Sequence, residues 1–104
     1  MSGVVPQMFT LAEAKRHLRV DHNDDDALIT IYSAAATAAA LTYTARDEVP
    51  EDARATAAFR SAALLMLGDL YEYRETGQVG SVSSGINVTA SARFLLDPWR
   101  MLTV

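Results

Sequence analysis

The chain has 104 residues, of which 50% are hydrophobic and 21% are charged, and its formal net charge is -4. This size and composition predict one globular domain with a modest core and exclude both two domains and a wholly disordered chain. Such an acidic chain gains no affinity for nucleic acid from counterion release, and the absence of cysteine excludes disulfides, thiolate metal sites and cysteine nucleophiles and fits a reducing cytoplasm.

The first nine residues have the features of an extended arm, because Pro6 disfavours an early helix. They also lack the basic and apolar regions of a secretory signal. We expect no membrane-spanning helix, on the view that charges interrupt every apolar run. Thr10 and Glu13 have the spacing of a capping box, which predicts a short helix that starts after Thr10. The apolar face of this helix consists of Leu11, Ala14 and Leu18.

A second helix is predicted from about Asp24 to Thr44, where the six alanines between residues 34 and 40 favour helix and give a thin layer of side chains. A neighbouring helix is therefore able to approach closely. Its predicted apolar stripe consists of Leu28, Ile31, Ala35, Ala38 and either Leu41 or Thr42.

A third and longer helix is predicted over residues 50–75, with Pro50 in its first turn and acidic residues Glu51 and Asp52 beside it. Gly68 in mid-helix predicts a close contact, because glycine there costs about 1 kcal/mol relative to alanine. Two adjacent stripes make the apolar surface wider than one antiparallel partner covers. They are Phe59, Ala63, Met66, Leu70 and Tyr73, and Arg60, Leu64, Leu67, Tyr71 and Arg74.

Residues 76–90 are rich in glycine and serine, which predicts a flexible loop with a short strand at 86–88. Ser91 is the expected cap of a last short helix, which Asp97 and Pro98 end before an apolar tail. The fold class is therefore all-α, a small bundle of two long antiparallel helices plus short N- and C-terminal helices. The single domain divides into an arm (1–9), a helical core (10–75), the loop (76–90) and a C-terminal helix with tail (91–104).

The acidic segment RVDHNDDDALI raises the possibility of a calcium site. Asp21, Asn23 and Asp25 match the first three ligand positions of an EF-hand loop. Position six of that loop requires glycine, but this chain has Asp26 there. Position twelve requires glutamate, but this chain has Tyr32. We therefore expect no metal here. The expected role is a helix start, with Asp24 as the cap and Asp25 and Asp26 in the first turn.

Other chemical candidates are weaker. His17 and His22 have no third ligand at a suitable spacing, so a surface or interface position is expected. GQVGSVSSG lacks the lysine of a P-loop and does not match the dinucleotide fingerprint. Ser81, Ser83 and Ser84 lack the glycine-flanked elbow of a hydrolase nucleophile. We expect no catalytic residue, no cofactor and no enzymatic activity.

Two apolar regions have no evident use inside one copy of the chain: the surplus width of the third helix, and the tail with Trp99, Met101, Leu102 and Val104. Such surfaces favour self-association or a partner. The alternative is that the tail and the fourth helix fold back over the third helix.

Three segments resemble the small α-helical head–tail connector proteins of tailed bacteriophages, also called adaptor or head-completion proteins. They are LAEAKRHLRVDHNDDDALI, LLMLGDLYEYRE and LLDPWR, and they occur in the family's order from Leu11 to Arg100. The resemblance implies a structural protein of the virion neck, assembled in the host cytoplasm. It implies a homo-oligomeric ring of about twelve subunits, a dodecamer, beneath the portal protein. Such a ring extends the DNA channel, lets DNA pass without specific binding, involves no membrane, and binds the stopper or tail-completion protein.

The resemblance also implies roles for particular residues. Subunit contacts would involve Asp24, Asp25, Asp26, Arg60, Tyr71 and Arg74. Portal docking would involve Pro98, Trp99, Arg100, Met101 and Leu102. A loop facing the channel or the stopper would include Gly77, Gly80, Ser83, Ser84 and Gly85.

The alternative function is a small dimeric helical interaction or regulatory module without ring assembly. A basic DNA-reading helix would favour it. The sequence offers none, because Lys15, Arg16 and Arg19 lie beside acidic residues.

Overall fold

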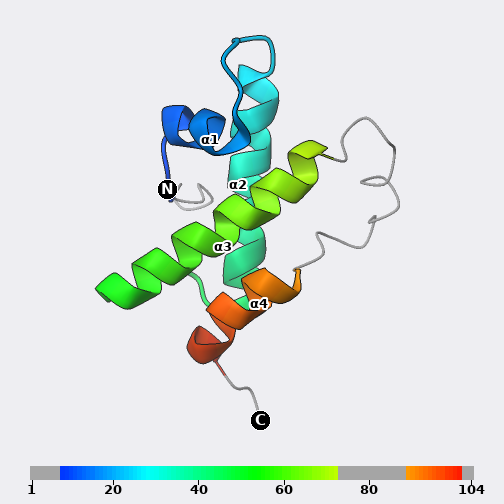
Figure 1. Cartoon of the computed structure of the whole chain (residues 1–104). Coiled ribbons are helices and arrows are strands. Elements are labelled where there is room, and N and C mark those ends of the chain that lie inside the picture. Colours follow the sequence, from blue (N-terminus) through cyan, green and yellow to red (C-terminus); the bar gives the residue numbers. More distant parts are fainter. Residues whose placement is uncertain (1–7, 73–88, 102–104) are drawn as a thin grey trace.

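The computed structural model describes residues 8–72 and 89–101, and these residues form helices and no strand (Figure 1). In chain order the elements are α1 (Leu11–Leu18), α2 (Asp26–Thr44), α3 (Ala53–Glu72), α4 (Ala90–Leu96) and the short 3-10 helix η2 (Asp97–Trp99). The prediction of an all-α fold is confirmed. The predicted strand at 86–88 and most of the Gly/Ser loop lie outside the described residues.

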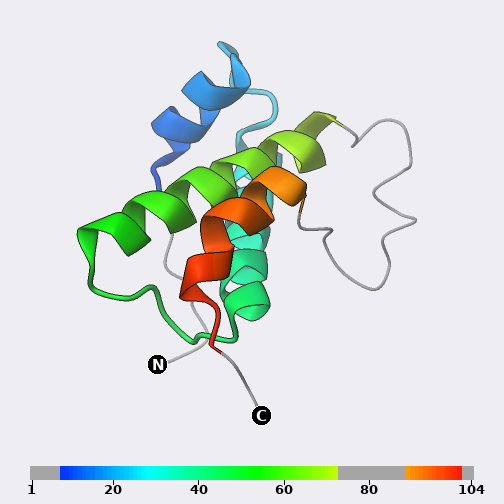
Figure 2. The same cartoon turned by 60° about the horizontal axis from the view of Figure 1, so that its bottom comes forward.

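The long helix α3 lies across α2 in both views, and the shorter helices pack on opposite sides of α3 (Figures 1 and 2). α1 contacts both α2 and α3, whereas α4 packs mainly on α3 and continues into η2. The two long helices cross in these views, and an antiparallel pairing along their whole length remains a prediction. The crossing leaves room for α1 on one side of α3 and for α4 on the other.

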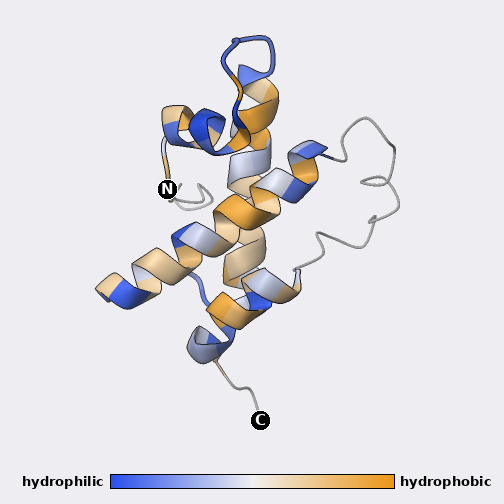
Figure 3. Ribbon diagram, viewed as in Figure 1, coloured by the Kyte–Doolittle hydropathy of each residue, from blue (hydrophilic) through white to orange (hydrophobic). Residues whose placement is uncertain are grey.

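The core is built from large side chains of α3 and mostly small ones of α2. Phe59, Met66 and Leu67 of α3 are fully buried, together with Ile29 of α2 and Leu96 of α4. Apolar residues of α3 are concentrated in its middle, where it crosses α2, and polar residues lie toward its two ends (Figure 3). Large side chains on one helix thus pack against a thin alanine layer on the other, which allows the close approach predicted for α2.

The predicted buried face of α2 is wrong, because the helix is rotated about its axis relative to the expected orientation. Ile31, placed in the core by the expected stripe, is 63% exposed. The residues of α2 that are buried are Ile29, Ser33, Ala36, Thr37, Ala40, Leu41 and Thr44. Three of these carry hydroxyl groups, which donate to backbone carbonyls four residues earlier at 2.7, 3.0 and 2.9 Å. Their burial therefore leaves no unpaired donor, and hydrophobicity alone does not select the face.

The same helix corrects the expectation that charges interrupt every apolar run. Among the described residues, α2 is long and apolar enough to cross a membrane by length and composition. A helix that packs inside a protein core passes the same test, and seven residues of α2 are buried in this core. The helix owes its apolar character to the alanines, to Ile29 and Leu41 on its buried side, and to the exposed Ile31.

The two predicted stripes of α3 agree with the structure as far as it is described. Phe59, Ala63, Met66 and Leu70 of the first stripe are buried, and Leu67 of the second is fully buried. The extra width is used by α4, whose Ala92 and Leu96 are completely buried. The fourth helix therefore folds back over α3, which was the alternative to a partner surface at this position.

The helix starts confirm one expected cap and correct three others. Glu13 accepts from the Thr10 amide at 2.8 Å, and Thr10 Oγ1 accepts from the Glu13 amide at 3.1 Å, which is the predicted capping box. Asp24 does not cap α2, because the helix begins at Asp26 and its N-cap residue is Asp25, which makes no side-chain cap bond. The side chains of Asp25 and Asp26 contact groups on other helices, Tyr71 of α3 and Lys15 of α1.

The other two corrections concern α3 and α4. α3 begins at Ala53, so Pro50 and Glu51 precede it, and the carboxylate of Asp52 accepts from the Arg54 amide at 2.7 Å. The cap of α4 is Thr89 and not Ser91, because the extended backbone of Thr89 directs its hydroxyl at the amide of Ala92.

The ends of α1 and α2 share an unusual feature. Arg19 and Ala45 adopt left-handed backbone conformations, with φ of 62° and 60°. Each lets the next amide bond back to a carbonyl five residues earlier, at 2.9 Å in both helices. This is the Schellman arrangement, in which glycine is the commonest residue. The turn after each helix is therefore built with a residue that disfavours it.

Candidate functional site

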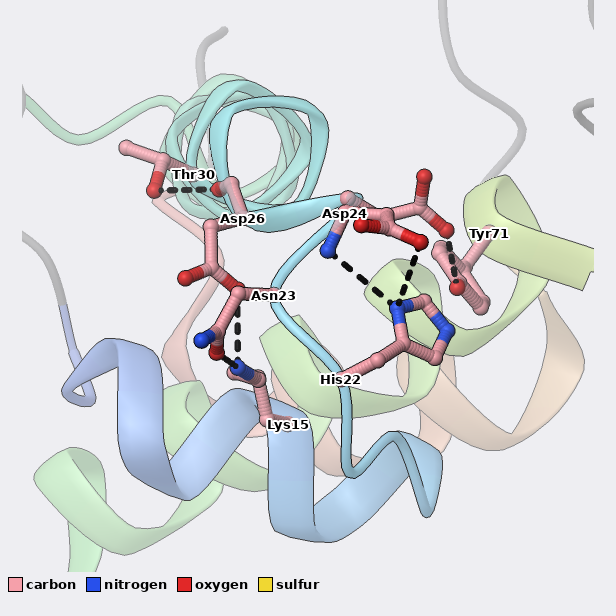
Figure 4. Close-up of polar contacts among 8 residues, drawn as sticks. Lys15, His22, Asn23, Asp24, Asp26, Thr30 and Tyr71 are labelled. Carbon is pink, nitrogen blue, oxygen red and sulfur yellow. Dashed lines mark hydrogen bonds and ion pairs between the residues drawn. The ribbon is translucent and has the colours of Figure 1, made fainter.

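The acidic turn, defined as residues 21–26, is held to α1 by a lysine. Lys15 Nζ lies 2.8 Å from Asp26 Oδ1 and donates to Asn23 Oδ1 at 2.7 Å (Figure 4). Asp26 Oδ1 is shielded from solvent, so the lysine supplies the contact that water would otherwise make. The ion pair fixes the start of α2 against α1.

Asp24 and Asp25 of the acidic turn make different contacts, and Figure 4 shows Asp24 beside His22. Asp25 Oδ2 accepts from the Tyr71 hydroxyl of α3 at 2.5 Å. The Asp24 side chain is 92% exposed and lies 3.9 Å from His22 Nδ1, which itself accepts from the Asp24 amide at 3.2 Å. The three carboxylates therefore diverge toward α1, α3 and solvent. No group of three potential metal ligands occurs among residues 8–72 and 89–101.

A second polar link joins α1 to α3. Arg60 donates to Glu13 Oε2 at 2.9 Å, while Glu13 Oε1 accepts from the Thr10 amide. These interactions lower the pKa of the Glu13 carboxyl, with the bond from the Thr10 backbone as the largest cause and the bond from Arg60 next. One glutamate thus caps α1 and holds that helix on α3.

A groove of about 510 Å³ lies between the C-terminal parts of α1 and α3. Its lining residues are His17, Leu18, Leu65, Gly68, Asp69, Tyr71 and Glu72. A methyl group added at Gly68 would lie 3.7 Å from His17 Nε2, which is ordinary van der Waals contact. His17 is therefore the neighbour of Gly68, but the space there admits a methyl group, so the structure does not support the expectation that a close contact requires glycine at this position. Burial and the nearby Glu72 raise the pKa of Asp69.

The residues that follow α4 are tied to the end of α2. The Trp99 carbonyl accepts from Arg46 Nε at 2.7 Å, and the Met101 amide donates to the Thr44 carbonyl at 3.0 Å. The guanidinium of Arg100 lies 4.7 Å from the centre of the Tyr43 ring. The Tyr43 hydroxyl donates to Asp97 Oδ1 at 2.5 Å, and that bond is the main reason why the pKa of Tyr43 is raised.

The expected site residues are thus partly brought together. Arg60, Tyr71, Asp25 and Asp26 belong to the contacts among α1, α2 and α3, whereas Asp24 faces solvent. Pro98 and Met101 are exposed and Trp99 is half-buried. The remaining expected residues lie outside the described part of the chain: Arg74, Gly77, Gly80, Ser83, Ser84, Gly85 and Leu102.

Sequence reasoning missed two exposed apolar residues, Ile31 of α2 and Phe94 of α4, which are 63% and 79% exposed. The spacing of α4 contains a signal for Phe94. Ala92 and Leu96 lie four residues apart and occupy the inner face, so the residue midway between them points outward.

Comparison with known proteins identifies the family. The family model described as "Phage gp6-like head-tail connector protein" matches residues 8–100. Searches of curated proteins and of solved structures found no match. The chain belongs to the phage gp6-like head–tail connector family, as its three sequence segments suggested. The family gives it a structural role in the neck of a bacteriophage particle, where it interacts with portal and tail proteins.

Proposed function

We propose that copies of this head–tail connector protein form a closed ring of about twelve subunits beneath the portal, bridging head to stopper or tail after DNA packaging. The ring extends the channel through which DNA leaves the head. The observation that carries the proposal is the family match over residues 8–100, which includes every described helix. The function is mechanical and requires neither a catalytic residue nor a cofactor.

The distribution of exposed apolar residues supports ring assembly. A ring generated by rotation uses heterologous contacts, so each subunit needs two different complementary patches. Ile31 on α2 and Phe94 on α4 lie on separate helices, and both are more than half exposed. A dimer with twofold symmetry would instead use one self-complementary patch.

The charge of the chain supports a channel through which DNA slides. With a net charge of -4, a subunit repels phosphates on average and gains little from binding them. DNA therefore passes without specific binding, and ring assembly is expected to be independent of DNA sequence.

Among the residues expected at subunit contacts, we assign the outward contact to Asp24, which is 92% exposed and available to a basic residue of a neighbouring copy. Asp25, Asp26, Arg60 and Tyr71 position the elements behind it. We retain Arg74 as a candidate contact, and Gly77, Gly80, Ser83, Ser84 and Gly85 as a loop toward the channel or the stopper.

We assign portal docking to the segment from Pro98 to Leu102. Met101 is 53% exposed, and the bond from its amide to Thr44 holds its backbone in place. Replacing Met101 by aspartate should reduce portal binding at least about tenfold, because a charge would enter an apolar contact. Pull-down with purified portal tests this, with unchanged helical circular dichroism as the control for folding. Full binding by the variant would overturn the assignment.

The test of the whole proposal is the mass of the protein in solution and on purified portal, by light scattering and negative-stain imaging. Rings, either alone or on the portal, are the expected result. A compact dimer that does not bind portal would support the alternative, a dimeric regulatory module. A monomer under both conditions would refute ring assembly.

A further inference from the structure

The outer side of α4 presents an exposed aromatic residue and an exposed cation, Phe94 and Arg93, which are consecutive in the chain. Ala92 and Leu96 turn inward and are completely buried, whereas Arg93 and Phe94 turn outward. Phe94 is 79% exposed. The Arg93 side chain is exposed as well and has no hydrogen bond or ion pair with any residue of 8–72 or 89–101, although its charge acts on the pKa of Tyr43. Aromatic and arginine side chains are the types most enriched at the centres of protein interfaces.

The groove between α1 and α3 has the complementary character. Leu18 and Leu65 supply apolar surface, and Leu65 is 37% exposed although it is aliphatic. Asp69 and Glu72 supply two carboxylates, which have no hydrogen-bond or ion-pair partner within the described part of the chain. Burial and the charge of Glu72 raise the pKa of Asp69, so an incoming cation would stabilise the charged form of Asp69.

Within one copy, the outer side of α4 and the groove between α1 and α3 do not contact each other. α1 and α4 lie on opposite sides of α3 (Figures 1 and 2). The groove is lined by residues of α1 and α3, whereas the exposed Phe94 belongs to α4. A surface and its complement on opposite sides of one helix generate a head-to-tail contact, which repeats around a ring. The groove is an open surface depression of about 510 Å³, which leaves space for a phenyl ring and a guanidinium to lie against it.

We propose that Phe94 and Arg93 of one copy dock into the groove of the next copy, with the ring against Leu18 and Leu65 and the guanidinium against Asp69 and Glu72. The occupant is a second copy of this chain, and the inference rests on the proposed ring. The opposite charges of the two surfaces are the reason for choosing this occupant.

Cross-linking tests the contact directly, because the chain has no cysteine of its own. One variant carries Ala90→Cys, one turn before Phe94, and a second, size-tagged variant carries Ser61→Cys, one turn before Leu65. Both positions are exposed and leave the proposed contact residues intact. Mixing them on purified portal with a short bismaleimide should give about tenfold more heterodimer than a control pair of Ala90→Cys with Ala27→Cys, an exposed position on α2.

Charge reversal makes the test specific for the salt bridge. Arg93→Glu in the Ala90→Cys chain should reduce the heterodimer about tenfold, because it places like charges together. Glu72→Arg in the Ser61→Cys chain should restore it. Arg54→Glu, which makes the same change in charge at a side chain that is 89% exposed, is the matched control and should have no effect.

A heterodimer yield equal to that of the control pair, or no response to Arg93→Glu, would overturn the docking of α4. The mass measurement separates this outcome from failure of the ring itself. Rings on the portal without the specific cross-link would leave the proposed function standing and exclude this contact. A monomer in the presence of portal would remove both.

Discussion

The acidic turn and the outer face of α4 differ in how their chemical groups are used. The acidic turn is the more conspicuous in the sequence, yet Lys15 and Tyr71 of the same chain engage two of its three consecutive aspartates. The face of α4 is inconspicuous, yet it leaves Phe94 79% exposed and Arg93 without an ion pair among the described residues. A cluster of charged residues in the sequence is therefore a poor guide to an interaction surface, because side chains from neighbouring helices of the same chain can bind those charges.

The largest expected effect distinguishes the buried side of α4, which carries Leu96, from its exposed side, which carries Phe94. Leu96→Ala should lower the free energy of unfolding by about 2–5 kcal/mol, because it opens a cavity at a completely buried position. Phe94→Ala should change it by less than about 0.5 kcal/mol. Urea unfolding of both variants gives the comparison. Similar losses for the two would show that Phe94 is covered within the monomer.

The acidic turn should respond to loss of its lysine. Lys15→Met should lower the free energy of unfolding by about 1–2 kcal/mol, because it leaves a solvent-shielded oxygen of Asp26 without its cation. Asp24→Ala is the matched control, since its side chain is 92% exposed, and should have an effect below about 0.5 kcal/mol. Equal effects in thermal unfolding would mean that the turn is not held by this ion pair.

Ala45, the left-handed residue that follows α2, offers a substitution that should stabilise the fold. Ala45→Gly should raise the free energy of unfolding by about 1 kcal/mol, because glycine adopts a φ of 60° without strain. Ala34→Gly, inside the same helix, should lower it by about 1 kcal/mol. Denaturant titrations measure both changes. A gain in stability for Ala45→Gly with a loss for Ala34→Gly would confirm the explanation, and a loss of stability in both variants would reject it.

Lowering the pH should weaken the contacts of Glu13, which join α1 to α3, and should not affect the packing of α4. The pKa of Glu13 is lowered in the folded chain, so its contribution to stability is present above the ordinary glutamate pKa of 4.5 and disappears as the pH falls through the lower pKa of the folded state. Wild type should therefore lose slightly more stability between about pH 5 and pH 3 than Glu13→Gln does. Parallel pH profiles of thermal unfolding for the two proteins would contradict this assignment.

Much of the fold follows from local patterns. The capping box at Thr10, the core stripe of α3 from Phe59 to Leu70 and the end of α4 before Pro98 agree with the structure. These features depend on residues three or four apart in the chain, so they are visible without tertiary information. The family resemblance is likewise carried by short ordered segments and is confirmed by the match over residues 8–100.

The buried face of α2 is the clearest example of what local patterns leave open. Nearly every position there is apolar, small or a hydroxyl residue that bonds its own helix backbone, so several rotations of the helix have similar hydrophobic character. The large side chains of α3 select one of them by packing. The caps of α2 and α4 were misplaced for a related reason, since several neighbouring residues are able to cap and the backbone decides which one does.

The sequence by itself determined the helical class, the order of the helices, the absence of cysteine chemistry and the family. Tertiary structure decided which charges are used internally, which side of α2 is buried, and where Phe94 and the groove lie relative to α3. The physical reason is range: helix formation and capping involve neighbours in the chain, whereas ion pairs such as that of Arg60 with Glu13 join residues that only packing brings together.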